Sequence, residues 1–192
     1  MAEYHKVVPT VGEMEAGIRP GRKPAVLDTP LGRFGFAICF DLNFEEVFQS
    51  AKKQGAEIIF FSSMYRGGLQ SQIWAYQYEM FFVGATITEN SLVVNPLGRI
   101  LAESSEYQQI QTVTLNLDCQ VLHLDYNEQK FSAIEKKYGR AVTLEVLSPE
   151  ALFLLTCHHP RKSVDDIIRE FGLETRQAYY SRARRTRKKY LQ

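Results

Sequence analysis

Residues 31–46 read LGRFGFAICFDLNFEE, and they decide the fold that we expect for this 192-residue chain. Residues 34–40 are mostly apolar at successive positions, which is typical of a strand buried on both faces in a layered sheet. Residues 44–54 then carry apolar side chains at helical spacing, and Gly55 supplies a helix stop. The stretch therefore predicts a buried strand that turns directly into a helix, with Cys39 at the junction.

Apolar runs on either side extend this strand into a sheet. Residues 25–29 and the turn at 30–33 predict a hairpin with the buried strand, and residues 56–62 predict another buried strand. Further along, the pattern predicts a helix at 74–81, an extended segment at 82–88, a hairpin at 91–102 and a half-buried strand with period-two alternation at 110–117. Mixed strands and helices of this kind favour a layered α/β domain over residues 1–118.

The sequence changes character after the α/β domain. We expect residues 119–160 to form a linker or arm, and residues 161–192 to form a basic, helix-turn-helix-like unit. In that unit Ser163 is placed to cap a first helix, Gly172 to end it, and a second helix follows over about residues 174–190. The fold class is therefore α/β with a small helical C-terminal extension.

Charge is nearly balanced over the whole chain, with 23 basic and 22 acidic residues. No overall field attracts this chain to nucleic acid or an anionic membrane. The last 32 residues differ, because they hold ten Lys and Arg residues against four Asp and Glu residues. Their cations and tyrosines could follow a phosphate backbone, although a solvated basic helix or a subunit-packing arm is the simpler interpretation. The basic residues concerned are Arg176, Arg182, Arg184, Arg185, Arg187, Lys188 and Lys189.

The cysteines indicate a reducing environment. Cys39, Cys119 and Cys157 have neither the short spacing of a zinc site nor the even count of a secreted disulfide framework. His158 and His159 follow Cys157, but adjacent side chains diverge and do not make a metal site. The N-terminus lacks an apolar signal region and no stretch is long enough to cross a membrane. We expect a cytoplasmic protein with no membrane contact, no metal and no cofactor.

Cys39 is the residue whose position most suggests chemistry. A cysteine at the end of a buried strand, just before a helical turn, exposes its sulfur at the carboxyl edge of the sheet. Free backbone N–H groups at the same turn could hold an oxyanion. The alternative is a small buried apolar residue, which is what most free cysteines are.

Two motifs resemble those of the nitrilase superfamily of carbon-nitrogen hydrolases. Residues 38–41, Ile-Cys-Phe-Asp, with residues 44–46, Phe-Glu-Glu, resemble its nucleophile motif, except that Glu45 stands where the family usually has proline. Upstream, residues 4–10 resemble the segment that carries the family's catalytic lysine. Glu13 falls where a supporting glutamate follows that lysine. The resemblance continues to about residue 118.

The resemblance implies a site and a reaction. Its candidate catalytic residues are Cys39, Lys6 and Glu13, and the backbone N–H near Phe40 would bind the oxyanion. The expected activity is hydrolysis of a non-peptide carbon-nitrogen bond, in a small amide or nitrile, through a cysteine thioester. A homo-oligomer is expected by the same analogy. The loop between residues 86 and 91 is shorter than is usual in the family, which affects the shape of the pocket.

The resemblance also predicts that part of the family's machinery precedes these residues. The general-base glutamate lies several elements before the lysine in the family, whereas only five residues precede Lys6 here. We therefore expect an incomplete αββα sandwich. The chain could be a fragment, complete its site with another polypeptide, or be a degenerate and inactive relative. A different class of function, nucleic-acid binding or regulation through the basic C-terminal helices, also stays open.

Overall fold

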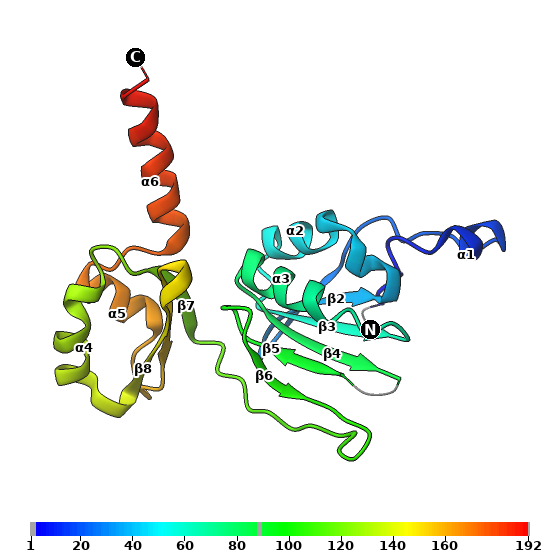
Figure 1. The fold of residues 1–192 in the computed structure, drawn as a ribbon, viewed down its shortest axis with the longest axis horizontal. Coiled ribbons are helices and arrows are strands. Elements are labelled where there is room, and N and C mark those ends of the chain that lie inside the picture. The colour runs from blue at the N-terminus through cyan, green and yellow to red at the C-terminus, as the bar shows by residue number, and fades with distance from the viewer. Residues whose placement is uncertain (1–2, 88–89, 192) are drawn as a thin grey trace. The chain divides into compact units, whose positions relative to one another are not determined.

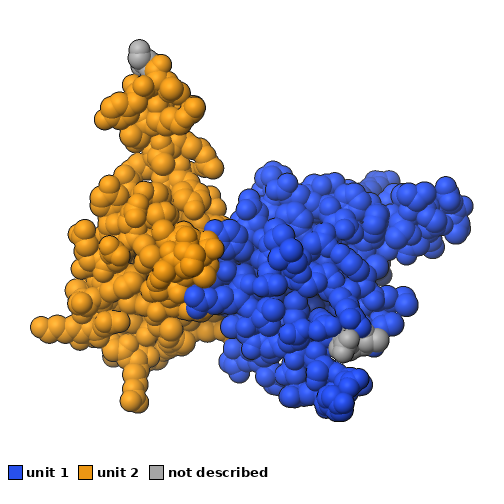
Figure 2. Space-filling model, viewed as in Figure 1, with its two compact units in different colours: residues 1–114 blue, residues 115–192 orange. Residues whose placement is uncertain are grey.

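The computed structural model describes residues 3–87 and 90–191, and it forms two compact units (Figures 1 and 2). The boundary lies between Thr114 and Leu115. The shortened loop predicted between Thr86 and Ser91 includes residues outside the described part of the chain. Each unit has its own hydrophobic core, so each is described by itself.

Unit 1 is built on a six-stranded sheet whose strands follow one another in chain order. β2, β3 and β4 are parallel, and β1, β5 and β6 pair antiparallel at the two sides. The predicted hairpins at 25–40 and 91–102 are both present, as β1 with β2 and β5 with β6. The strands are β1 (Val26–Thr29), β2 (Gly32–Ile38), β3 (Ile58–Ser63), β4 (Phe81–Thr86), β5 (Leu92–Val94) and β6 (Ile100–Glu103).

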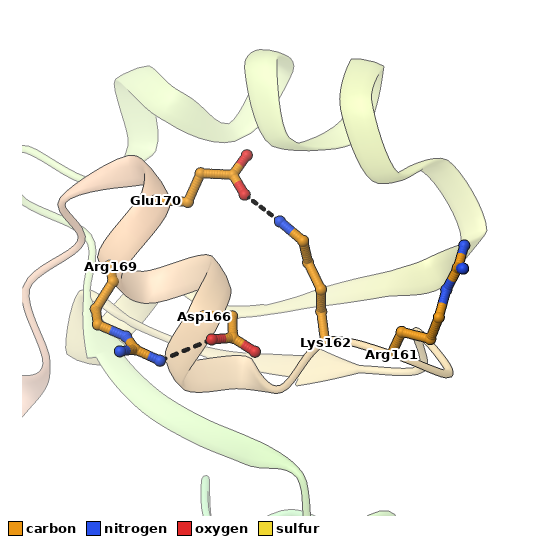
Figure 3. A pocket seen from close by; sticks show the side chains of 5 residues that line it. All are labelled: Arg161, Lys162, Asp166, Arg169 and Glu170. Carbon is orange, nitrogen blue, oxygen red and sulfur yellow. Dashed lines mark hydrogen bonds and ion pairs between the residues drawn. The ribbon is translucent and has the colours of Figure 1, made fainter.

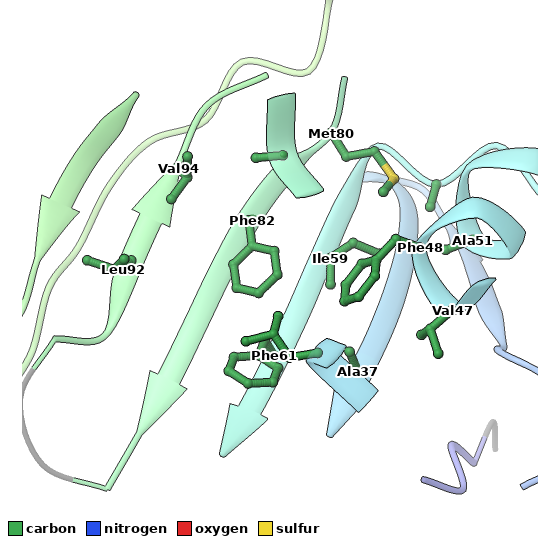
Figure 4. Packing of buried hydrophobic residues seen from close by; sticks show 13 residues of the cluster. Ala37, Val47, Phe48, Ala51, Ile59, Phe61, Met80, Phe82, Leu92 and Val94 are labelled. Carbon is green, nitrogen blue, oxygen red and sulfur yellow. The ribbon is translucent and has the colours of Figure 1, made fainter. Parts of the chain in front are cut away.

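Two helices, α2 (Glu45–Lys53) and α3 (Gly68–Tyr78), pack on one face of this sheet (Figures 1 and 4). α2 follows β2 through the 3-10 turn η1 (Cys39–Asn43), as the strand-to-helix prediction requires. Phe48 of α2 is fully buried and stacks on Trp74 of α3, with 5.1 Å between ring centroids. Burial of one such aromatic side chain contributes about 1.5–3 kcal/mol, so this stack is a major part of the core.

The opposite face of the sheet carries aromatic side chains that are only half-buried. Phe34 and Phe36 of β2 alternate with Gly35 and point away from the helices, and Phe60 of β3 packs edge-on against Phe34 at 5.3 Å. The remaining helix of unit 1, α1 (Val11–Glu15), buries no residue and so does not cover this face. Within the described residues the architecture is thus a sheet layered on one side, an incomplete form of the predicted sandwich.

The predicted strand at 110–117 is absent from the structure. These residues are irregular, although their side chains alternate in polarity. A strand needs a neighbouring strand for its backbone N–H and C=O groups, and alternation alone does not supply one. The helix predicted at 74–81 is also displaced, because α3 spans Gly68–Tyr78 and Phe81 already belongs to β4.

Unit 2 contains a three-stranded antiparallel sheet in the order β7-β9-β8. Residues 119–160, predicted as a linker or arm, supply all three of its strands. Their apolar side chains share one core with Ile134 of α4 and Ile167 of α5, and this shared burial is why the segment folds. The elements are β7 (Cys119–His123), η2 (Glu128–Lys130), α4 (Phe131–Tyr138), η3 (Gly139–Ala141), β8 (Val142–Leu147), η4 (Ser148–Glu150), β9 (Leu152–Cys157), α5 (Val164–Phe171) and α6 (Arg176–Lys189).

The two C-terminal helices lie where the sequence predicts them. The Ser163 hydroxyl accepts a hydrogen bond from the Asp166 N–H and caps α5, and Gly172 ends that helix in a left-handed conformation with φ of 56°. Leu173 is buried, and the Thr175 hydroxyl caps α6. Local capping chemistry therefore fixes the turn between the helices.

A polar cluster joins α5 to the rest of unit 2 (Figure 3). Glu170 accepts hydrogen bonds from the Lys162 ammonium at 2.5 Å and the Tyr138 hydroxyl at 2.6 Å, and it pairs with Lys137 of α4. These partners, Lys137 first, lower the pKa of Glu170 to about 2. Beside this cluster, Asp166 pairs with Arg169 at 2.7 Å on the same helix.

Substituting Gly67 by alanine should destabilise unit 1. Gly67 has a φ of 64°, and an added Cβ would lie 2.0 Å from Cδ2 of the fully buried Leu42. Strain and overpacking together should cost roughly 2–5 kcal/mol. Urea unfolding followed by fluorescence measures this, because Trp74 is the single tryptophan of the chain and belongs to unit 1. Gly12→Ala is the control, since its Cβ would meet nothing within 4 Å. Equal stabilities of the two variants would contradict this account.

The Glu170 cluster should make unit 2 sensitive to acid. A carboxylate whose pKa is lowered on folding stabilises the fold above its unfolded value of about 4.5 and loses this effect as pH falls toward about 2. We expect Glu170→Gln to lower the stability of unit 2 at pH 7, and the difference from the native chain to shrink between about pH 4.5 and 2. The stability of unit 2 in each variant can be measured by circular dichroism together with amide exchange of residues 131–171. A difference that stays constant over this pH range would refute the assignment.

Candidate active site

Cys39 lies at the carboxyl end of β2 and is the first residue of η1. Its φ is 47°, a left-handed conformation that residues other than glycine rarely adopt and that costs of order 1–3 kcal/mol. The side chain is half-buried rather than enclosed in the core. The backbone strain thus turns the thiol out of the strand at the edge where the N–H groups of η1 begin, and Phe40 supplies the next of these.

A buried carboxylate two residues later joins this turn to the N-terminal segment. Asp41 is fully buried, and its Oδ1 accepts the Val8 N–H at 2.7 Å. Its Oδ2 accepts the Tyr4 hydroxyl at 2.8 Å and the Ile38 N–H at 3.0 Å. Burial, followed by the charge of Asp41, raises the pKa of Tyr4, so the phenol stays a donor. Asp41 therefore holds the Tyr4 side chain and the Val8 backbone, on either side of Lys6, against the end of β2.

Lys6 itself is paired with Glu13. The Lys6 ammonium donates to Glu13 Oε2 at 2.6 Å, and only 14% of the lysine side chain is exposed. The same oxygen accepts the Thr10 N–H at 2.6 Å, as part of the capping box of α1. Lys6 first, and then Thr10, lower the pKa of Glu13 to about 2. Glu13 is consequently an anion that orients the lysine.

The far side of the turn is held by α3. The Trp74 indole N–H donates to the Leu42 carbonyl at 2.8 Å, and the Gln70 amide donates to Asn43 Oδ1 at 3.1 Å. The Tyr78 hydroxyl donates to Glu45, the residue that replaces the family's usual proline. The turn that carries Cys39 is thus fixed by hydrogen bonds from both the N-terminal segment and a helix.

The structure pairs Lys6 with Glu13, and Asp41 joins Tyr4 and Val8, which flank Lys6 in the sequence, to the turn that contains Cys39 and Phe40. In the sequence, Asp41 is part of the resembling motif but has no assigned role. A charged residue between two apolar runs could have indicated one, because a buried charge requires hydrogen-bond partners. Across residues 3–87 and 90–191, no three His, Cys, Asp or Glu side chains are grouped to hold a metal ion. No helix in this described part is long and apolar enough to span a membrane.

The model of the carbon-nitrogen hydrolase family matches residues 1–121. This chain belongs to that family. The match covers unit 1 and ends at β7, so it includes every residue of the candidate site.

Curated relatives match parts of the carbon-nitrogen hydrolase region. The omega-amidase of Saccharomyces cerevisiae is 26% identical over 122 residues, which are 55% of this chain and 41% of that protein. The deaminated glutathione amidase of Yersinia enterocolitica is 51% identical over 41 residues, 21% of this chain and 14% of that protein. The chain thus spans less than half the length of these relatives.

Solved structures of nitrilase-superfamily amidases share the fold. One is a mutant of the Nesterenkonia sp. amidase with the acetamide moiety of fluoroacetamide covalently added at its active site cysteine. The match is 23% identical, has a TM-score of 0.50, and covers 55% of this chain and 46% of the amidase chain. The likeness supports the layered α/β fold of unit 1.

Replacing Asp41 by asparagine should loosen the N-terminal segment. An amide presents an NH₂ group where one carboxylate oxygen now accepts, so at least one buried donor loses its partner at a cost of about 1–3 kcal/mol. Amide exchange over residues 4–10, Val8 above all, should become faster. Asp28→Asn is the control, because Asp28 is an exposed residue that pairs with Arg33 at 3.5 Å. Unchanged exchange at Val8 in Asp41→Asn would show that the carboxylate does not hold the segment.

Proposed function

We propose that this carbon-nitrogen hydrolase acts on small amides through a thioester at Cys39. The observation that carries the proposal is the strained, half-buried cysteine at the carboxyl end of β2, joined by one buried carboxylate to the segment of Lys6. The sulfur, the first N–H groups of η1 and an oriented ammonium are the parts that acyl transfer requires.

In the proposed reaction the Cys39 thiolate attacks the amide carbon, and the C=O electron pair moves onto oxygen. The Phe40 N–H and the Lys6 ammonium stabilise this oxyanion. Collapse of the intermediate breaks the C–N bond, the amine leaves with the proton that a general base took from the Cys39 thiol, and a thioester remains on Cys39. Water then attacks the thioester, releases the carboxylic acid and restores the thiol.

Glu13 has a positioning role in this scheme. A carboxylate with a pKa of about 2 that is bound to Lys6 and Thr10 is a weak proton acceptor at neutral pH. Glu3 pairs with His5 at 3.6 Å and is 76% exposed, which also does not suit a base. We therefore assign the proton transfers to a carboxylate other than these two.

Amides are favoured over nitriles as substrates because the two curated relatives described above are named for amide hydrolysis. The covalent adduct in the Nesterenkonia amidase supports a cysteine nucleophile in the same fold. A cytoplasmic location and a homo-oligomeric state complete the proposal, the first from the cysteine pattern and the second from the family resemblance.

An activated ester tests the nucleophile separately from the base, since p-nitrophenolate leaves without a proton. We expect p-nitrophenyl acetate to acetylate Cys39 in preference to Cys119 and Cys157, as peptide mapping would show. Lys6→Met should slow p-nitrophenolate release by about 10–100-fold through loss of an oxyanion partner. Cys39→Ala should abolish acetylation at that position.

Lys23→Met is the matched control, because Lys23 is an exposed lysine of the same unit. It should react at the rate of the native chain. Acetylation mainly at Cys119, or equal rates for Lys6→Met and Lys23→Met, would reject the proposed roles of Cys39 and Lys6.

A further inference from the structure

The second half of α6 is an exposed and strongly cationic helix. All residues from 182 to 191 are exposed, and six of them are Arg or Lys: Arg182, Arg184, Arg185, Arg187, Lys188 and Lys189. No acidic residue follows Glu174 in the sequence. This concentration of charge lies outside the region matched to the hydrolase family, so the proposed hydrolysis does not account for it.

The first half of α6 anchors it to unit 2. Thr175 forms a bridge with Leu122 of β7, and the Tyr179 ring stacks on His123 with 4.0 Å between centroids. The Tyr179 hydroxyl also donates to Asp125 at 2.5 Å. Figure 1 shows the helix leading away from the other elements of unit 2 beyond this anchor. The second half of α6 thus extends from a first half that is fixed to unit 2.

The acidic residues near the helix are already paired. The Glu174 carboxylate accepts hydrogen bonds from both Nε and Nη2 of Arg182, the shortest at 2.9 Å and 2.6 Å respectively. On α5, Asp166 pairs with Arg169, and Glu170 is held by Lys137 and Lys162. By contrast, apart from the coulombic attraction of Arg185 to Glu174, no side-chain hydrogen bond or ion pair links residues 183–191 to another described residue. The cations beyond Arg182 are therefore available to an external anion.

The cations do not cover the whole circumference of the helix. Ala183, Thr186 and Tyr190 are spaced by three and four residues, so they share one uncharged face. Arg182 and Lys189 border this face on one side and Arg187 borders it on the other, by the 3.6-residue periodicity. This face continues the one by which Tyr179 packs on His123, so the cations lie on its flanks and on the opposite side of the helix.

We propose that the exposed second half of α6 binds duplex DNA in the major groove, with its cations on the phosphates of both strands. The exposed residues 182–189 of α6 span about 12 Å, and the helix with its side chains is about 10–12 Å wide. The major groove of B-DNA is about 12 Å wide and admits such a helix. The deep, narrow major groove of duplex RNA does not.

The turn before α6 supports this choice. Four residues, from Gly172 to Thr175, separate α5 from α6, which is the turn length of a helix-turn-helix, although here the exposed part is the second half of α6. Leu173 fills the core below this turn, and the cap at Thr175 starts α6 at a defined residue.

Fluorescence anisotropy with a labelled 24-base-pair duplex tests the proposal on the full chain. The association constant should fall as the salt concentration rises. The magnitude of the slope of log K against log salt concentration should decrease by roughly 0.9 for each phosphate-binding cation that is removed. The triple variant Arg184→Gln, Arg187→Gln and Lys188→Gln should bind at least about 100-fold more weakly at 0.1 M salt. These positions are exposed, and circular dichroism checks that the variant is folded.

A matched triple variant elsewhere in unit 2, Lys136→Gln, Arg140→Gln and Arg161→Gln, removes the same charge from exposed positions outside α6. It should bind DNA within about threefold of the native chain, as should Cys39→Ala, because the proposal is independent of the hydrolase site. Absence of salt-dependent binding would overturn the proposal. Equal loss in both triple variants, or tighter binding to single-stranded RNA or to phosphatidylserine vesicles than to the duplex, would also overturn it.

Discussion

The buried Asp41 carboxylate is the contact on which the candidate site depends. It accepts a phenol and two backbone N–H groups, from residues 4, 8 and 38, so three parts of one site share a single anion. A buried carboxylate without such partners is strongly destabilising, which makes this arrangement close to all-or-none. Asp41 thereby joins the segment that contains Lys6 to the turn that contains Cys39.

The core beneath the site makes that arrangement rigid. Phe48, Trp74 and Phe82 form a connected aromatic group between the helices and the sheet, and Trp74 also binds the Leu42 carbonyl. The packing that stabilises unit 1 thus also fixes the turn of Cys39. The half-buried aromatic residues on the other face of the sheet, Phe34, Phe36 and Phe60, contribute less because part of their surface stays in water.

Unit 2 is organised by different forces. Its sheet and helices close around an apolar core, while α5 is joined to α4 by ion pairs of Glu170 and α6 is anchored by Tyr179. Neither set of contacts involves a residue of the candidate active site. The two units therefore support separate chemical roles, one based on a nucleophile and the other on exposed positive charge.

The sequence by itself determined the strand-to-helix turn at Cys39, the hairpins, the caps at Ser163 and Gly172, and the family. These features depend on local patterns, in which periodicity and capping residues act over a few positions. It did not reveal that residues 119–160 fold into a sheet or that residues 110–117 form no strand, because strand pairing depends on distant partners.

Tertiary structure alone decided the role of Asp41. Two of its three donors, Tyr4 and Val8, lie more than thirty positions before Asp41 in the sequence. No local sequence pattern indicates a contact over that separation. The pairing of Lys6 with Glu13 was within reach of the sequence, because Glu13 follows Lys6 by only seven positions and belongs to a capping box with Thr10. What joins that pair to Cys39 is a buried charge, and only the folded chain shows where a buried charge finds its partners.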